Sequence, residues 1–151
     1  MPAKITPGKL ILSLVATTTS ASCYVADWRY PFPQFLQSSH STLSNPPSPP
    51  STTHVFNPAW PPHAKFHNGQ TMSMGLCLGL LTLYYTWRPT HTPNDSLFTA
   101  ALLGSLYWIT GMSAILYPGT MWADPEFGQD APQRTAFAVL AVLAWVGYVV
   151  G

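Results

Sequence analysis

The sequence predicts an all-α fold, a four-helix transmembrane bundle, and two observations carry this prediction. Only 7% of its 151 residues are charged and 47% are hydrophobic, whereas soluble domains carry roughly 25% charged residues. The chain also contains four apolar runs without a charged residue, at 10–26, 71–87, 96–116 and 135–151. Each run approaches the roughly 20 residues that a spanning helix needs. One integral membrane domain over residues 1–151 is therefore expected.

The first run, residues 10–26, follows Lys4 and Lys9 and ends before Asp27. It is the weakest of the four, because two lysines, a short apolar core and the small residues Ser-Ala-Ser are also typical of a secretory signal peptide. A first spanning helix and a removable leader both stay open as interpretations.

Before the second run, Pro61 and Pro62 suit the first turn of a helix, where their missing N–H groups are not needed. A helix from these prolines to Trp87 would be about 39 Å long at 1.5 Å per residue. Since the hydrocarbon core of a bilayer is about 30 Å thick, the first turns would project into the interface.

The third and fourth runs complete the predicted bundle. Asn94 or Asp95 is expected to cap the start of 96–116, and Pro118-Gly119 is expected to end it. With four spans, the loop after the first span and the loop after the third lie on one side of the membrane. Lys4 and Lys9 favour a cytosolic N-terminus, so this side would be lumenal.

Residues 31–52 interrupt the first loop with a stretch rich in proline and serine. This composition is typical of a disordered linker. A retained intron is the other interpretation, because without the insert "ADWR" would continue directly into "THVFNPAWPPHAKFH". No structure or function is assigned to the insert.

Polar groups gather where the second helix is expected to begin. On a helix, His63, His67, Gln70 and Met74 form one stripe that becomes apolar with depth, as the wall of a lipid-accessible pocket would. The predicted ligand-binding residues of this pocket are Asn68, Gln70, Trp60 and His54.

Histidine is suited to general acid–base work because imidazole titrates near neutral pH. The candidate catalytic residues are His63 and His67, oriented by Asp27 or Asp124. The spacing of "HAKFH" is also that of helical metal ligands, but the glutamate of a metalloprotease helix is absent and Lys65 lies between the histidines. No metal and no cofactor are expected. A further interpretation is that these side chains only bond to headgroups and loops and perform no chemistry.

The run "THVFNPAWPPHAKFHNGQTMSMG", with "ADW" before it and "YPGTMWADPEFG" after it, resembles a family of small fungal four-span membrane proteins. Their function is uncharacterised, and some are labelled acetyltransferase. The resemblance implies a fungal source and an endomembrane location, and some relatives lie beside biosynthetic genes for lipophilic metabolites. The insert departs from the family's continuous loop, which favours the intron interpretation. More distantly, the chain is similar to emopamil-binding and DoxX-like bundles, by fold alone.

Two functions follow as hypotheses. The first is an integral membrane protein of the endoplasmic reticulum that binds, and in one version converts, a hydrophobic small molecule in fungal lipid or secondary-metabolite biosynthesis. The alternative is a non-catalytic accessory or scaffold subunit of a membrane-bound biosynthetic enzyme. Membrane lipid is an expected partner in both. Nucleic acid is not, because the net charge is only +1 and no basic footprint is present.

Overall fold

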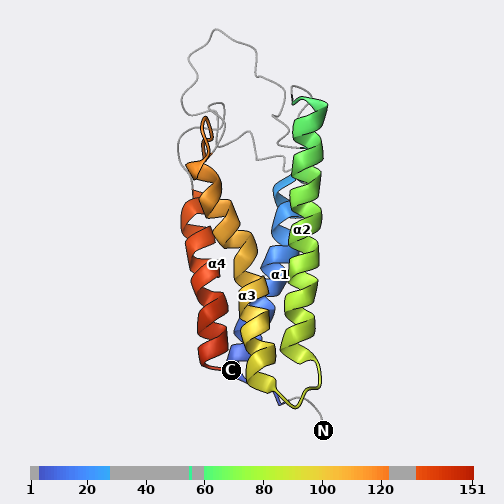
Figure 1. Ribbon diagram of the computed structural model, residues 1–151, viewed down its shortest axis with the longest axis vertical. Helices are drawn as coiled ribbons and strands as arrows, with labels where there is room; N and C mark the ends of the chain where they lie inside the picture. The colour runs from blue at the N-terminus through green and yellow to red at the C-terminus, as the bar shows by residue number, and fades with distance from the viewer. Residues whose placement is uncertain (1–3, 28–54, 56–59, 123–131) are drawn as a thin grey trace, which may run out of the picture. The chain divides into compact units, whose positions relative to one another are not determined.

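The computed structural model describes residues 4–27, 55, 60–122 and 132–151, except for the side chains of Cys23, Ala26, Asp27 and Pro132. The described part is all-α (Figure 1). Its helices are α1 (Pro7–Asp27), α2 (Pro62–Trp87), α3 (Pro93–Ser113), the 3-10 turn η3 (Ala114–Leu116) and α4 (Pro132–Val149). The all-α prediction is confirmed, and the insert at 31–52 lies outside the described residues.

Every α-helix begins at a proline, namely Pro7, Pro62, Pro93 and Pro132. Proline favours this position because its fixed φ angle already suits a helix and its missing N–H would have no helical partner. The predicted cap at Asn94 or Asp95 is therefore wrong. Pro93 sets the first turn of α3, Thr92 precedes it without a side-chain capping bond, and Asp95 lies inside that turn.

α3 ends at Ser113, before the predicted stop at Pro118-Gly119, and η3 continues the helical chain to Leu116. Gly119 has a φ angle of 77°, which glycine adopts without the steric penalty of a side chain. Immediately after it, the Thr120 hydroxyl donates to the carbonyl oxygens of Ala114 and Tyr117 at 2.9 and 2.8 Å. Both carbonyl oxygens also accept backbone N–H bonds, from Tyr117 and Thr120 respectively, so side-chain and backbone bonds together close the turn.

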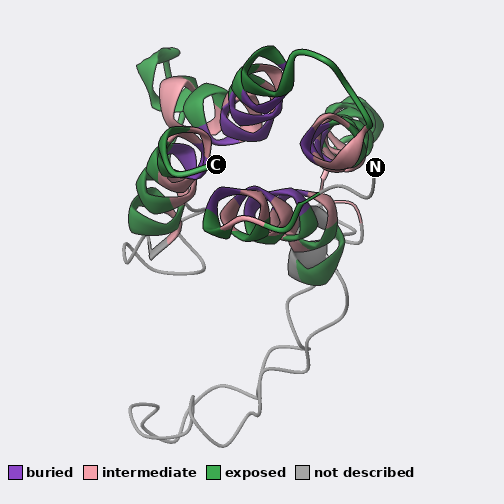
Figure 2. Ribbon diagram, turned by 90° about the horizontal axis from the view of Figure 1, so that it is seen from below, coloured by how far each residue is buried: buried purple, intermediate pink, exposed green. Residues whose placement is uncertain are grey.

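The chain divides into two compact units, Met1–Ala21 with Met74–Gly151, and Ser22–Ser73. In the first unit, α3 packs along α4, and the buried residues lie on helix faces turned toward each other (Figure 2). α1 contacts all three other helices there. Two apolar clusters show this, the first built from Leu12, Leu97, Ala100 and Ala101 with Tyr85, Trp145 and Tyr148, and the second from Val15, Trp108, Ala141 and Ala144 with neighbouring side chains of α3 and α4.

Two indole hydrogen bonds tie α1 to its neighbours within this unit. The Trp87 Nε1–H donates to the Ser13 hydroxyl at 2.9 Å, which joins α2 to α1. The Trp108 Nε1–H donates to the buried Thr19 hydroxyl at 3.0 Å, which joins α3 to α1. Trp108 thereby buries its ring, and Trp87 half-buries its own, without losing a hydrogen-bond partner.

α2 lies close to α1 at Gly79. A Cβ atom at this position would lie 2.6 Å from the Ala16 carbonyl oxygen and would also overlap the Ser20 hydroxyl. The backbone of α1 therefore occupies the space that any side chain would need. Gly69, on the same helix, has nothing within 4 Å of the corresponding position.

By length and composition, one helix of the described residues can cross a membrane, Pro93–Leu116 with 24 residues. Gln133–Val149 is a shorter apolar helix. The sequence prediction of four spans is thus supported for one. α1 carries hydroxyl residues at 17–20 and the first turns of α2 are polar, and such residues lower the average hydropathy.

We expect Gly79→Ala to destabilise the protein by about 1–3 kcal/mol, because the added methyl group meets backbone that must move. Gly69→Ala is the matched control and should be neutral or stabilising by about 0.5–1 kcal/mol, since it only raises helix propensity. Thermal unfolding of the purified chain in detergent micelles measures both. Equal shifts for the two variants would show that α1 does not pack against Gly79.

The burial of α1 also predicts that it stays in the mature protein. Leu12, Val15, Ala16 and Thr19 have no exposed surface, so removal of a leader would uncover the core. The intact mass of chain purified through a C-terminal tag should therefore include residues 7–27. A product that begins after Cys23 would establish the signal-peptide interpretation instead.

Candidate functional site

His63 and His67 lie one turn apart near the start of α2 and contact each other. Their Nε2 atoms are 3.0 Å apart, so one ring donates a hydrogen bond to the other. The ring centroids are 4.5 Å apart and the planes meet at 79°. Both side chains are exposed. The predicted pairing of the two histidines on one helix face is confirmed.

Phe66 belongs to the same surface, although the sequence analysis did not single it out. Its ring lies 5.5 Å from that of His67 in an edge arrangement, and 6.1 Å from that of His63 with nearly parallel planes. His63, Phe66 and His67 together are the histidine cluster. The signal available in the sequence was the spacing of three residues between His63 and Phe66, which brings side chains together on a helix.

The cluster lies on the exposed side of α2. His63, His67, Gln70 and Met74, the predicted stripe, are all exposed. The half-buried residues of these turns are instead Ala64, Lys65, Asn68, Gly69 and Met72, and the buried residues further along are Gly75, Gly79, Thr82 and Thr86. The stripe therefore lies on a more exposed face of these turns than Ala64, Asn68 and Met72 do.

Among the predicted ligand-binding residues, Asn68 is half-buried and donates from Nδ2 to the Met72 sulfur at 3.9 Å. Gln70 is exposed, and Trp60 is half-buried just before the helix. Thr71 donates its hydroxyl to the His67 carbonyl oxygen at 3.0 Å. Of these residues, Thr71 has a hydrogen bond to the backbone of the histidine cluster.

The other predicted site residues lie outside what the structure describes. Asp27 is the last residue of α1, but its side chain is among those excepted, and His54 and Asp124 fall in the undescribed segments. A carboxylate partner for the histidines therefore stays a prediction. Among the described residues, no group of three or more His, Cys, Asp or Glu side chains is placed to hold a metal ion.

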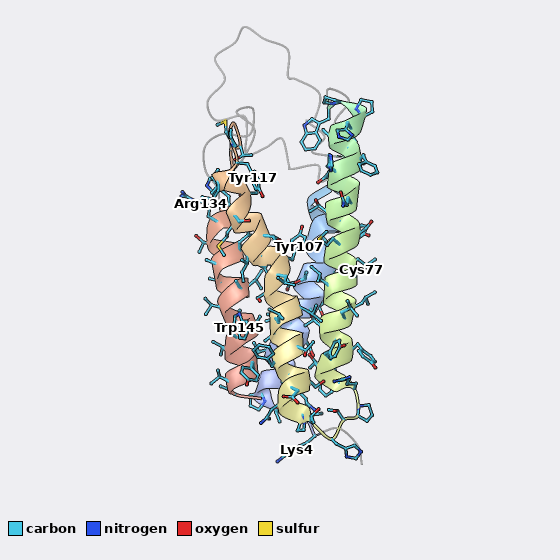
Figure 3. The ribbon with its side chains drawn as sticks, viewed as in Figure 1. Lys4, Cys77, Tyr107, Tyr117, Arg134 and Trp145 are labelled. Atoms are coloured by element: carbon cyan, nitrogen blue, oxygen red, sulfur yellow. The ribbon has the colours of Figure 1, made fainter. Side chains whose placement is uncertain are left out.

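A second polar arrangement, which the sequence analysis missed, joins the end of α2 to the start of α3. Arg88 donates from Nε to the Ser96 hydroxyl at 2.8 Å, and this hydroxyl donates to the Tyr85 carbonyl oxygen at 2.7 Å. The Arg88 guanidinium also lies 4.5 Å from the centre of the Tyr85 ring. The Lys9 ammonium lies 5.4 Å from the ring of Trp87. In Figure 3, Lys4 and Arg134 lie at opposite ends of the helices.

Fold and site together define a small all-α protein of four packed helices that carries an exposed histidine cluster at the start of α2. The chain belongs to DUF6640, a family of unknown function, whose model matches residues 48–151. The match includes the histidine cluster, α2, α3 and α4, whereas α1 and Asp27 lie outside it. No curated protein and no solved structure matches the chain.

Proposed function

We propose that this chain is a four-span integral membrane protein of the endoplasmic reticulum that binds a hydrophobic small molecule at the membrane boundary. The observation that carries the proposal is the apolar outer surface of all four helices. Its exposed members include Leu10 and Leu14 on α1, Leu80 and Leu81 on α2, Leu102 and Ile109 on α3, and Val142 and Val146 on α4. Large exposed apolar surfaces on a folded chain mark contact with membrane or partner.

Hydrogen bonding supports the same proposal for the two less apolar helices. On α1, the hydroxyls of Ser13 and Thr17 donate to carbonyl oxygens one turn back, each at 2.8 Å. On α2, the hydroxyls of Thr82 and Thr86 do the same at 2.8 and 2.7 Å. A polar group that already has a partner costs far less in hydrocarbon than a free one. The mean hydropathy of a helix treats these hydroxyls as if they had no hydrogen-bond partner.

The proposed orientation places the N-terminus in the cytosol, because Lys4 and Lys9 precede the first span and positive residues are enriched on that side. Arg88, at the far end of α2 from the histidine cluster, would share this side. The cluster then lies at the lumenal boundary. There the first turns of α2 extend past the hydrocarbon, because a helix of 26 residues is about 39 Å long.

At this boundary the cluster offers polar groups beside an apolar helix surface. A neutral imidazole presents one N–H donor and one acceptor, and Met74, one turn beyond Gln70, is half-exposed. The polar end of a small molecule would bond to His63 and His67 while its apolar body lies along α2. In the catalytic version, a histidine oriented by Asp27 or Asp124 transfers a proton. The remaining proposed contacts are Asn68, Gln70, Trp60 and His54.

The ligand class comes from the resemblance described above, which implies fungal lipid or secondary-metabolite biosynthesis. The exposed apolar faces also suit the alternative, an accessory subunit of a membrane-bound biosynthetic enzyme. Small residues are the usual contact surface between membrane helices. Here Gly79 faces α1, and a Cβ atom at Gly104 would lie 3.2 Å from Thr82, so a partner would bind a different face.

Cysteine labelling distinguishes an arrangement with four membrane spans from one in which only α3 crosses the membrane. In a chain with Cys23 and Cys77 changed to serine, His91→Cys and Val150→Cys should react with an impermeant maleimide from the same side of the membrane, because two spans separate them. If only α3 crosses, they should react from opposite sides. Gly119→Cys should react from the side opposite to His91→Cys in both arrangements and controls the integrity of the vesicles.

The role of the histidines is tested by deletion of the gene followed by profiling of apolar metabolites. An accumulated precursor names the ligand class, and the wild-type gene should remove it. His63→Ala with His67→Ala should fail to do so at normal protein level, because both polar contacts are lost. His91→Ala, an exposed histidine at the other end of α2, should restore the profile fully. Full restoration by the double variant would exclude the histidine cluster from the function.

A further inference from the structure

We infer that the His63–His67 pair is a chelating site for a divalent first-row transition-metal ion. Their Nε2 atoms are 3.0 Å apart. An ion bonded to both nitrogens at about 2.0–2.1 Å, with an angle between 90° and the tetrahedral value, needs a nitrogen–nitrogen distance of about 2.9–3.4 Å. The helix therefore already holds the two donor atoms at a chelating separation.

Binding of the metal ion requires only a change of tautomer in one of the two imidazole rings. The ring that now donates through Nε2–H must carry its proton on Nδ1 instead, so that both Nε2 lone pairs face the ion. This is a tautomer change of a neutral ring and releases no proton overall. Both side chains are exposed, so their Nδ1 atoms can meet water. The edge contact with Phe66 keeps the His67 ring on this face.

Two features of "HAKFH" argued against a metal site, namely the missing glutamate and Lys65. Neither of them removes the imidazole donor nitrogens of His63 and His67. The glutamate of a metalloprotease helix serves as a general base and is not a ligand. Lys65 lies two residues from each histidine, which is about 200° around the helix. It is half-buried, whereas the histidines are exposed. Its ammonium group thus belongs to another face of α2.

The donor set selects the ion. Two neutral nitrogen donors favour Cu²⁺, Ni²⁺ and Zn²⁺ over Mg²⁺ and Ca²⁺, which prefer oxygen, and Cu²⁺ leads this order. Because the described residues offer no third ligand in a cluster of His, Cys, Asp or Glu, the remaining positions would hold water. Metal binding does not depend on the proposed function. A role for the bound metal ion would rest on the proposed function, since an open coordination position at the membrane boundary could accept the polar end of the bound small molecule.

The test uses the full chain in detergent micelles, titrated with CuSO₄ and followed by calorimetry and electron paramagnetic resonance. Wild type should bind Cu²⁺ with hyperfine coupling to two imidazole nitrogens. His63→Ala and His67→Ala should each weaken binding at least about tenfold, because the second donor no longer acts at high effective concentration. His91→Ala should bind as wild type does. Zn²⁺ should slow amide hydrogen exchange over residues 63–71, because it joins two turns.

The inference fails if either single histidine variant binds Cu²⁺ as tightly as wild type, or if the spectrum shows no pair of imidazole nitrogens. Its failure is distinguishable from that of the proposed function. Intact Cu²⁺ binding together with full metabolic restoration by the double variant would overturn the proposed function alone. Loss of restoration without any Cu²⁺ binding by wild type would overturn the metal site alone.

Discussion

The packing of α1 against three other helices is the constraint on which the first unit depends. Within that unit it supplies Leu12 to the first apolar cluster and Val15 to the second, and it accepts two indole hydrogen bonds. Small residues make this possible, because they let the helix backbones approach closely. At Gly147, a Cβ atom would lie 3.1 Å from the Gly8 carbonyl oxygen, so α4 approaches α1 as closely as its backbone allows.

This packing also explains where polar chemistry remains. Inside the helices, hydroxyl groups bond to carbonyl oxygens one turn back, and the two indoles bond to hydroxyls of α1. Among the described residues, the Ser20 and Ser22 hydroxyls of α1 are buried without a hydrogen-bond partner, and the other polar groups described above lie at helix ends. The histidine cluster occupies one end of α2, and Arg88 and Tyr85 occupy the other. The family match covers both ends of α2 but stops short of α1.

The apolar runs and the prolines predicted the helices well, because run length and the first-turn preference of proline are local properties of the chain. α2 begins at Pro62 and ends at Trp87, as the sequence indicated. The direction in which the His63 stripe faces was not predictable, since α2 packs through Gly75 and Gly79 and such a face is chosen by size rather than by hydropathy. The role of Ser96 was also hidden, because its partner Tyr85 lies on another helix and its partner Arg88 lies in the connection after that helix. The contribution of Asp27, His54 and Asp124 stays a prediction.

The two indole bonds have a mechanical consequence for α1. Ser13 and Thr19 are six residues apart, which corresponds to about 9 Å along the axis and about 240° around it. One bond is directed to α2 and the other to α3. A shift of α1 by one turn along its axis, or a rotation about that axis, would break both hydrogen bonds together. The two bonds therefore fix both the axial position and the rotation of α1. α1 can therefore move relative to α2 and α3 only after both bonds have broken.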